Sequence, residues 1–192
     1  MHPDAKAELR RHLLAARRGR RPGTGEDAAA ARLLLALPEV GAARTVAAYV
    51  GLPGEPGTAP LLAALRGRGV RVVLPVVGPG LDLAFRRYGG ELVPAGRGTW
   101  APPPHAPAVP LGEADVVVVP ALAVDLAGRR LGRGGGCYDR ALPRARPGAL
   151  VVALLHEGEL VERVPAAPHD QPVAAVVTAR RVVRLPVRDL PR

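Results

Sequence analysis

Cysteine, aromatic residues and long apolar runs are all scarce in this sequence, and each scarcity excludes a class of protein. Cys137 is the one cysteine among 192 residues, so no internal disulfide framework can form. Aromatic residues make up 3% of the chain, and a core must therefore be built mainly from Ala, Val and Leu. No apolar run reaches the roughly 18 residues that a membrane span needs, and no export leader is recognisable. We therefore expect a cytoplasmic protein without a membrane partner.

Lysine is also scarce, although the chain is strongly basic. The formal net charge is +10, yet Lys6 is the one lysine among 27 Lys and Arg residues. Ala, Gly, Pro and Arg are abundant along the whole chain, which indicates a bias of coding composition more than a dedicated basic surface. Since no recognition helix, zinc motif or aromatic platform accompanies the charge, nucleic-acid binding is disfavoured as the main function. We expect no specific nucleic-acid partner.

The amino-terminal pattern predicts two helices. Asp4 is a candidate cap for a helix that runs to about Arg18, because apolar residues recur there at helical spacing. Thr24 and Asp27 have the spacing of a capping box for a second helix through "AAAARLLLAL". Pro38 would end that helix, since proline cannot continue the hydrogen-bond ladder.

Short apolar runs recur through the rest of the chain and predict a buried sheet. They lack the alternation of a half-solvated sheet, and continuous runs are what strands covered on both faces require. The segment 58–69, "TAPLLAALRGRG", has a helical pattern and supplies a crossover between two of the runs. We expect a three-layer α/β domain over residues 1–192, with an open, largely parallel sheet, flanking helices and a monomeric state. The predicted strands are 45–50, 70–75, 114–120, 149–155 and 173–178.

Residues 76–113 have a weaker pattern. The stretch "LDLAFRRY" is a candidate antiparallel edge strand, and a Pro- and Gly-rich connection follows it. A connection of this length is either a surface excursion or a functional cover, and the sequence leaves both interpretations open.

The stretch 128–142, "GRRLGRGGGCYDRAL", follows the predicted strand 114–120 and leads into a short helical pattern. Ligands bind at the carboxyl ends of strands in open α/β sheets, and a glycine run entering a helix presents main-chain N–H groups to an anion. The loop is neither a P-loop nor a dinucleotide fingerprint, because Lys–Ser/Thr and a third spaced glycine are missing. A plain flexible turn stays open as an alternative to a phosphate site. The candidate phosphate contacts are Gly132, Gly134, Gly135 and Gly136, with Arg130, Arg133 and Arg140.

Two aspartates near the predicted carboxyl edge of the sheet are candidate metal ligands. Asp139 lies just inside the helix after the glycine loop, where it would either stabilise the helix terminus or hold a magnesium ion that bridges phosphates. Asp170, in "PHDQP", precedes the last apolar run and is within reach of the same edge. His169 beside it is interpreted as a loop histidine, because no metal-binding His spacing occurs elsewhere.

Five segments together resemble the 5-formyltetrahydrofolate cyclo-ligase family: "KAELR", "YVGLPGEPGT", "VRVVLPVV", "VVVVPALAVDLAGRRLGRGGGCYDRAL" and "PHDQPVAAVVT". The fourth is the specific one, and the others occur in the family's order. The resemblance implies a fold of the NagB/RpiA/CoA transferase-like type. It also implies an ATP- and magnesium-dependent closure of 5-formyltetrahydrofolate to 5,10-methenyltetrahydrofolate, with ADP and phosphate as the other products.

Matched position by position, the resemblance also implies site residues. Arg133 and Tyr138 would be catalytic, Asp139 and Asp170 would hold Mg²⁺, and Glu55 would contact the pterin. Val50, Glu55, Arg133 and Cys137 would form the folate site. The ATP site would comprise Lys6, Arg10, Arg130, Gly132, Arg133, Gly134, Gly135, Gly136, Cys137 and Tyr138.

Three positions depart from the family's usual residues. Cys137 stands where the family usually has the first of two tyrosines, Val124 replaces a usual Phe, and Ala101 replaces a frequent Glu. Two alternatives therefore stay open beside the cyclo-ligase interpretation. One is a family paralogue that acts on a different small molecule, and the other is a non-catalytic basic protein that holds folate or nucleic acid.

Overall fold

The computed structural model describes residues 3–20, 24–96, 98–165, 167 and 169–186. In this part of the chain, seven strands form one sheet in the order β12-β11-β9-β6-β1-β2-β3. The five predicted strands are its five central members, and all four pairings among them are parallel. Their bounds are β1 (Thr45–Ala47), β2 (Arg71–Val77), β6 (Val116–Pro120), β9 (Leu150–Leu154) and β11 (Ala175–Val177).

The two edge strands run antiparallel to their neighbours. The candidate edge strand in "LDLAFRRY" is confirmed as β3 (Leu83–Arg87), which pairs with β2. β12 (Val182–Arg184) pairs with β11 at the other edge. The connection after β3 contains a small hairpin of β4 (Val93–Pro94) and β5 (Trp100–Ala101).

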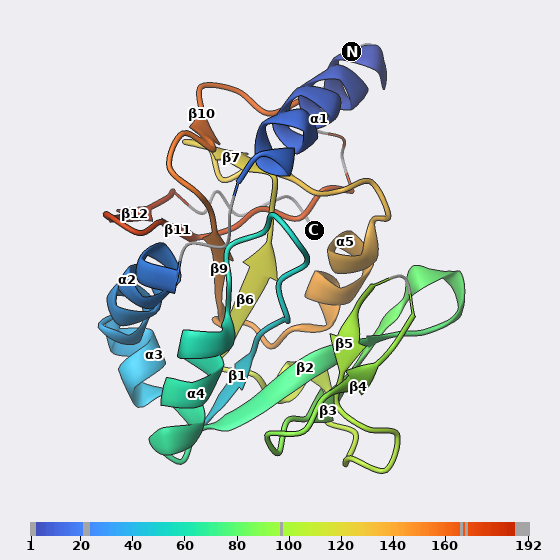
Figure 1. Cartoon of the computed structure of the whole chain (residues 1–192), viewed down its shortest axis with the longest axis vertical. Helices are drawn as coiled ribbons and strands as arrows, with labels where there is room; N and C mark the ends of the chain where they lie inside the picture. Colours follow the sequence, from blue (N-terminus) through green and yellow to red (C-terminus); the bar gives the residue numbers. More distant parts are fainter. Residues whose placement is uncertain (1–2, 21–23, 97, 166, 168, 187–192) are drawn as a thin grey trace.

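Helices and loops cover both faces of the sheet, as the continuous apolar runs require (Figure 1). On one face Val46, Val72 and Val116 pack with α2 (Thr24–Leu35), α3 (Pro38–Ala42) and α4 (Ala59–Gly67). On the other face the alternate residues Ala47, Val73 and Val117 pack with α5 (Cys137–Ala141) and the 3₁₀ turn Leu142–Arg144. The predicted three-layer α/β architecture is therefore confirmed.

The first helix lies apart from these layers, at the top of Figure 1. α1 (Pro3–Arg18) packs through Leu13 and Leu9 on a small sheet that the sequence did not predict. Its strands are β7 (Ala123–Asp125), β8 (Arg130–Leu131) and β10 (Leu160–Val161), in the order β10-β7-β8. No helix in the described part of the chain is long and apolar enough to span a bilayer.

The helix ends differ from two sequence expectations. α1 includes Pro3, so Asp4 lies inside its first turn and not at a cap; proline with its fixed φ suits a first turn. Thr24 and Asp27 do not form the predicted capping box: Thr24 is helical, and Asp27 Oδ1 accepts a hydrogen bond of 2.8 Å from the Gly57 amide. α2 ends at Leu35, and Pro38 begins α3 instead of ending α2.

Candidate functional site

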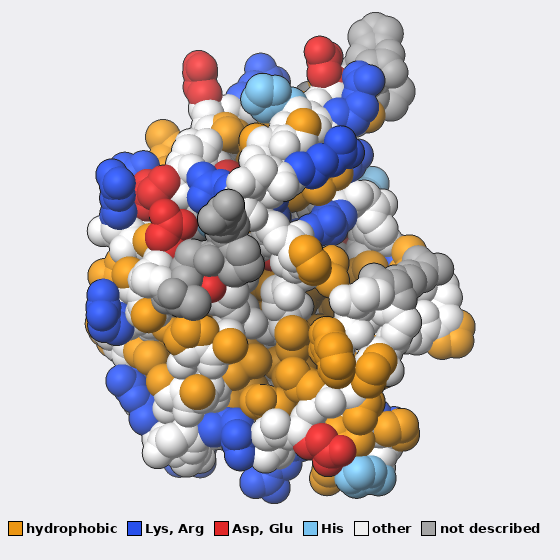
Figure 2. Space-filling model, in the orientation of Figure 1, with side chains coloured by type: hydrophobic (Ala, Val, Ile, Leu, Met, Phe, Trp, Pro, Cys, Tyr) orange, Lys and Arg blue, Asp and Glu red, His pale blue; other side chains and the backbone are white. Residues whose placement is uncertain are grey.

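A cavity of about 600 Å³ lies at the carboxyl ends of the central strands. Its wall includes Tyr49 just after β1, Val77 at the end of β2 and Pro120 at the end of β6, together with the glycine loop. In the space-filling view, basic side chains border the upper part of this face and hydrophobic side chains gather below them (Figure 2). The position agrees with the rule that open α/β sheets bind ligands beyond the carboxyl ends of their strands.

All fourteen candidate site residues line this one cavity, although they come from segments far apart in the sequence. Arg140, expected as a further phosphate contact, is not among the lining residues, and its guanidinium instead binds main-chain carbonyls. The fourteen are Lys6, Arg10, Val50, Glu55, Arg130, Gly132, Arg133, Gly134, Gly135, Gly136, Cys137, Tyr138, Asp139 and Asp170.

The glycine loop depends on glycine at three of its positions. Gly134 and Gly136 have φ values of +110° and +64°, which side chains rarely adopt. At Gly135 a Cβ would lie 3.2 Å from the Cys137 sulfur and 3.4 Å from a methyl carbon of Leu81, so no side chain fits without movement. Gly136 stands directly before α5, and the loop therefore opens its main chain toward the cavity at the start of that helix.

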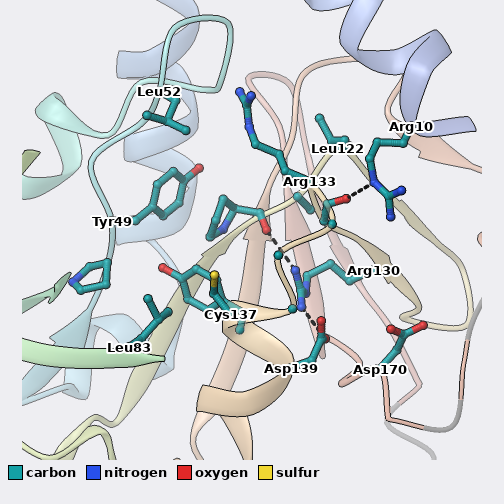
Figure 3. Close-up of a pocket in the computed structure, with 18 of the residues that line it drawn as sticks. Arg10, Tyr49, Leu52, Leu83, Leu122, Arg130, Arg133, Cys137, Asp139 and Asp170 are labelled. Carbon is teal, nitrogen blue, oxygen red and sulfur yellow. Dashed lines mark hydrogen bonds and ion pairs between the residues drawn. The ribbon is translucent and has the colours of Figure 1, made fainter. Parts of the chain in front are cut away.

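Helix α1 brings two cations to the cavity. Lys6 Nζ pairs with Asp170 Oδ2 at 2.6 Å. Arg10 Nε donates a hydrogen bond of 3.0 Å to the Gly132 carbonyl (Figure 3). The two residues are one helical turn apart, so they share a face of α1. The first helix is thereby joined to the glycine loop and to the loop before β11.

A second ion pair lies deeper in the same wall. Arg130 Nη2 donates to Asp139 Oδ1 at 2.6 Å, and the Arg130 side chain is 3% exposed. The same Asp139 oxygen accepts a hydrogen bond of 3.2 Å from the main-chain N–H of Gln171. The Arg130 Nε atom is buried and has no hydrogen-bond partner in the described part of the chain. A buried cationic donor without a partner is costly unless a ligand binds it.

Asp139 and Asp170 belong to neighbouring stretches of this wall, since the residue after Asp170 bonds to Asp139. Burial alone would raise the pKa of Asp170, but hydrogen bonds from Lys6 and from the Ala167 amide outweigh it and hold the pKa below its ordinary value. His169 Nε2 is 3.8 Å from Asp170, and the imidazole is 77% exposed, as a loop histidine would be.

The described residues contain no cluster of three or more His, Cys, Asp or Glu side chains that would hold a metal ion unaided. Two carboxylates nonetheless fit Mg²⁺, which is usually held by one or two carboxylates with substrate phosphates and water as its other ligands. Asp139 and Asp170 both line the cavity beside the glycine loop, so a phosphate there would complete such a set.

Glu55 and Arg133 form an ion pair in the wall of the cavity. Arg133 Nε donates to Glu55 Oε1 at 2.7 Å, and the other carboxylate oxygen accepts a hydrogen bond of 2.9 Å from the Leu52 amide. The Glu55 side chain is 5% exposed, whereas that of Arg133 is 41% exposed. The loop after β1 is therefore tied to the glycine loop by this ion pair.

Sequence reasoning missed the apolar and tyrosine wall of the cavity. Leu52, Leu83 and Tyr49 lie around it with Tyr138 (Figure 3). The hydroxyls of both tyrosines are buried and without a hydrogen-bond partner among the described residues, and burial raises the pKa of both. The position of Tyr49, just beyond a buried parallel strand, was the signal that would have found it.

Of the three positions that depart from the family pattern, Cys137 alone is a lining residue of the cavity. Val124 is fully buried in the apolar core beneath it. Ala101 is 2% exposed in β5. Of the three substitutions, Cys137 is therefore the one placed to contact a ligand in this cavity.

A mostly parallel α/β sheet, with a cationic cavity and a glycine loop at its carboxyl edge, defines a protein of the class that binds phosphorylated ligands. The model of the 5-formyltetrahydrofolate cyclo-ligase family matches residues 2–179, and the chain belongs to this family of ligases. The resemblance seen in the sequence is thereby confirmed.

Relatives of known name agree with this assignment. The chain is 44% identical over 189 residues to the 5-formyltetrahydrofolate cyclo-ligase of Mycolicibacterium smegmatis, covering 94% of this chain and 97% of that one. It is 37% identical over 163 residues to the Escherichia coli protein of the same name, covering 80% and 87%. The solution structure of Aquifex aeolicus 5,10-methenyltetrahydrofolate synthetase superposes with a TM-score of 0.82 at 30% identity, covering 97% and 96%. A synthetase from Mycoplasma pneumoniae, at 18% identity and a TM-score of 0.74 over 91% and 99%, shares the fold.

Proposed function

We propose that this protein catalyses the ATP-dependent cyclisation of 5-formyltetrahydrofolate to 5,10-methenyltetrahydrofolate, with release of ADP and phosphate. The observation that supports it is the convergence of all fourteen candidate residues on one cavity in a chain of this family. The cavity has a cationic, glycine-rich half suited to a triphosphate. Its other half is apolar and includes the carboxylate of Glu55, which suits a pterin.

The reaction needs no protein nucleophile. The formyl oxygen on N5 attacks the γ-phosphorus, the bond from that phosphorus to the β,γ-bridging oxygen breaks, and ADP leaves. N10 then attacks the formyl carbon, the carbon–oxygen bond breaks, phosphate departs with the formyl oxygen, and N10 loses its proton. The protein therefore acts by holding the two substrates in line and by stabilising negative charge on the transferring group.

We assign the triphosphate to Lys6, Arg10, Arg130 and the main-chain amides of the glycine loop. Arginine forks and oriented amides are strong phosphate ligands, and the unpartnered Nε of Arg130 supports this assignment. Asp139 and Asp170 would hold Mg²⁺ against the phosphates, where the ion would neutralise part of their charge. In the structure each carboxylate is paired with a cation, Asp170 with Lys6 and Asp139 with Arg130. We therefore propose that the metal binds together with the nucleotide, whose phosphates would take over these two cations.

We assign the pterin to Glu55, whose carboxylate can accept paired hydrogen bonds from a ring N–H and an amino group. Val50 and Cys137 would form part of the pocket wall beside it. Arg133 and Tyr138 are the proposed catalytic residues, because both line the cavity beside these groups. Arg133 is bonded to Glu55, and the Tyr138 hydroxyl has no partner among the described residues.

We further propose that the protein works in the cytoplasm as a single-domain monomer, with its small-molecule substrate as partner and without specific nucleic-acid or membrane binding. The support is that every candidate residue comes from one chain and lines one cavity.

The test is the ultraviolet absorbance of the methenyl product, followed with 5-formyltetrahydrofolate and Mg²⁺ in the presence and absence of ATP. An ATP-dependent rise that Asp139→Asn reduces by at least about a hundredfold is expected, since a positioned metal and its charge are lost. Glu113→Gln is the matched control, because it breaks an exposed ion pair with Arg71 at the amino end of β2. A flat trace from folded protein that still binds ATP would refute the proposal and favour a paralogue acting on another small molecule.

A further inference from the structure

Arg140, an exposed residue of α5, bridges two segments beside the cavity. Its Nη2 group donates to the Gly135 carbonyl at 2.9 Å, to the Leu81 carbonyl at 2.9 Å and to the Gly80 carbonyl at 3.2 Å. Gly135 belongs to the glycine loop, whereas Gly80 and Leu81 form the turn between β2 and β3. One exposed guanidinium therefore holds together two loops that are far apart in the sequence.

The turn that Arg140 binds has an unusual backbone. Gly80 and Leu81 have φ values of +63° and +62°. Among the described residues, Leu81 is the one residue other than glycine with a positive φ. Leucine in this region is strained by roughly 1 kcal/mol or more and persists only where its surroundings hold it. The surroundings here include the hydrogen bonds that Arg140 donates to the Gly80 and Leu81 carbonyls.

The turn and the glycine loop connect to different halves of the cavity. Val77, just before the turn, and Leu83, just after it, are part of the apolar wall. The glycine loop is the part assigned to the triphosphate. The spacing between these two halves fixes how far a bound phosphate lies from a bound substrate, and an error of about 1 Å in such a spacing is worth on the order of a hundredfold in rate.

We infer that Arg140 is a positioning residue that clamps the glycine loop to the β2–β3 turn and thereby sets the distance between the two substrates. The inference rests on the proposed function for its kinetic consequence, while the clamp itself stands on the hydrogen bonds above. Arg140 touches neither reacting group, so it acts through Gly135 and Leu81.

Arg144 supplies a matched control for Arg140. It binds the far end of the same turn, through the Asp82 carboxylate at 2.9 Å and the Leu83 carbonyl at 2.7 Å. Its side-chain hydrogen bonds go to the turn and to β3, with none to the glycine loop in the described chain. Removal of Arg144 therefore loosens the turn without releasing the loop.

The experiment compares Arg140→Ala, Arg140→Lys and Arg144→Ala with the unaltered protein. In the product-absorbance assay, Arg140→Ala should lower kcat about tenfold, which corresponds to about 1.4 kcal/mol, while the KM for each substrate stays within about threefold. Arg140→Lys should recover part of the loss, and Arg144→Ala should retain the full kcat. This split distinguishes positioning from weaker binding, and a thermal unfolding midpoint close to that of the unaltered protein excludes a general loss of structure.

A second readout does not depend on turnover. Cys137, the one cysteine of the chain, directly follows Gly136, so its rate of reaction with a thiol reagent reports opening of the glycine loop. Arg140→Ala should raise this rate about fivefold in the ligand-free protein, and Arg144→Ala should leave it unchanged. A faster rate therefore means a more open loop, since the Gly135 carbonyl is then no longer held by Arg140.

The outcomes separate the two proposals. Unchanged thiol rate and kcat in folded Arg140→Ala would overturn the clamp, and so would equal losses in Arg140→Ala and Arg144→Ala. A faster thiol rate in Arg140→Ala, in a protein whose unaltered form shows no turnover, would support the clamp and refute the proposed function.

Discussion

The ion pair between Glu55 and Arg133 leads to a prediction in which one substitution changes the affinities for two ligands in opposite directions. Glu55→Gln keeps the shape of the side chain but removes its charge. Arg133 is then no longer held at 2.7 Å by a carboxylate, and the cavity gains one unit of positive charge. The affinity for ATP in the absence of folate should therefore rise, although a polar group has been altered in the site.

The structure sets the size of this effect. Glu55 is 5% exposed but Arg133 is 41% exposed, so solvent screens the pair and its value lies near the upper end for surface ion pairs, about 1 kcal/mol. Release of that energy corresponds to about a fivefold lower dissociation constant for ATP. Binding of 5-formyltetrahydrofolate should weaken about tenfold or more, because an amide oxygen replaces a charged acceptor for the pterin.

Titration calorimetry with Mg²⁺ and a non-hydrolysable ATP analogue measures the first effect, and titration with 5-formyltetrahydrofolate alone measures the second. Glu113→Gln is again the control, since its ion pair with Arg71 is exposed and lies at the other end of β2. Nucleotide affinity that falls or stays the same in Glu55→Gln would refute the reasoning, because it would mean that Arg133 is not restrained by Glu55.

Three further predictions concern pH, backbone conformation and an unpaired hydroxyl. The pKa of Asp170 is lowered in the folded protein, so its carboxylate stabilises the fold above pH 3.8 and this contribution is lost as the pH falls through the folded-state pKa. Asp170→Asn should therefore weaken the dependence of the unfolding free energy on pH in the acid range. Gly128→Ala should cost more than about 1 kcal/mol of unfolding free energy in urea titrations, because φ is +79° and the new Cβ would lie 2.6 Å from a main-chain oxygen. Gly148→Ala, with φ of +80° and open space around it, should cost less, and equal losses would contradict the steric argument. Tyr138→Phe should leave the unfolding midpoint nearly unchanged, since its hydroxyl has no partner among the described residues, yet lower kcat in the absorbance assay. A normal kcat would remove Tyr138 from the catalytic residues.

The strands were predictable because continuous apolar runs have one stable use in a chain of this length, namely a sheet covered on both faces. The ends of the strands were less predictable. β1 stops at Ala47, although the apolar run extends to Val50, and the last residues of the run form part of the cavity wall. Helix ends were misjudged where a side chain had a distant partner. Asp27 binds the Gly57 amide, and no local rule for helix caps includes that amide.

By itself, the sequence determined the class of sheet, the place of the glycine loop at the carboxyl end of a strand, and the family. Each of these depends on patterns within a few residues: unbroken apolar runs, glycines at fixed offsets, and motifs in a fixed order. Tertiary structure alone decided which charged groups meet. Lys6 pairs with Asp170 and Glu55 pairs with Arg133, across 164 and 78 positions of sequence. Arg140 was expected at the phosphate site, but it binds the turn between β2 and β3. Such pairs depend on where the crossovers bring each strand end, and the energy of one ion pair or hydrogen bond is too small to leave a mark in local sequence pattern.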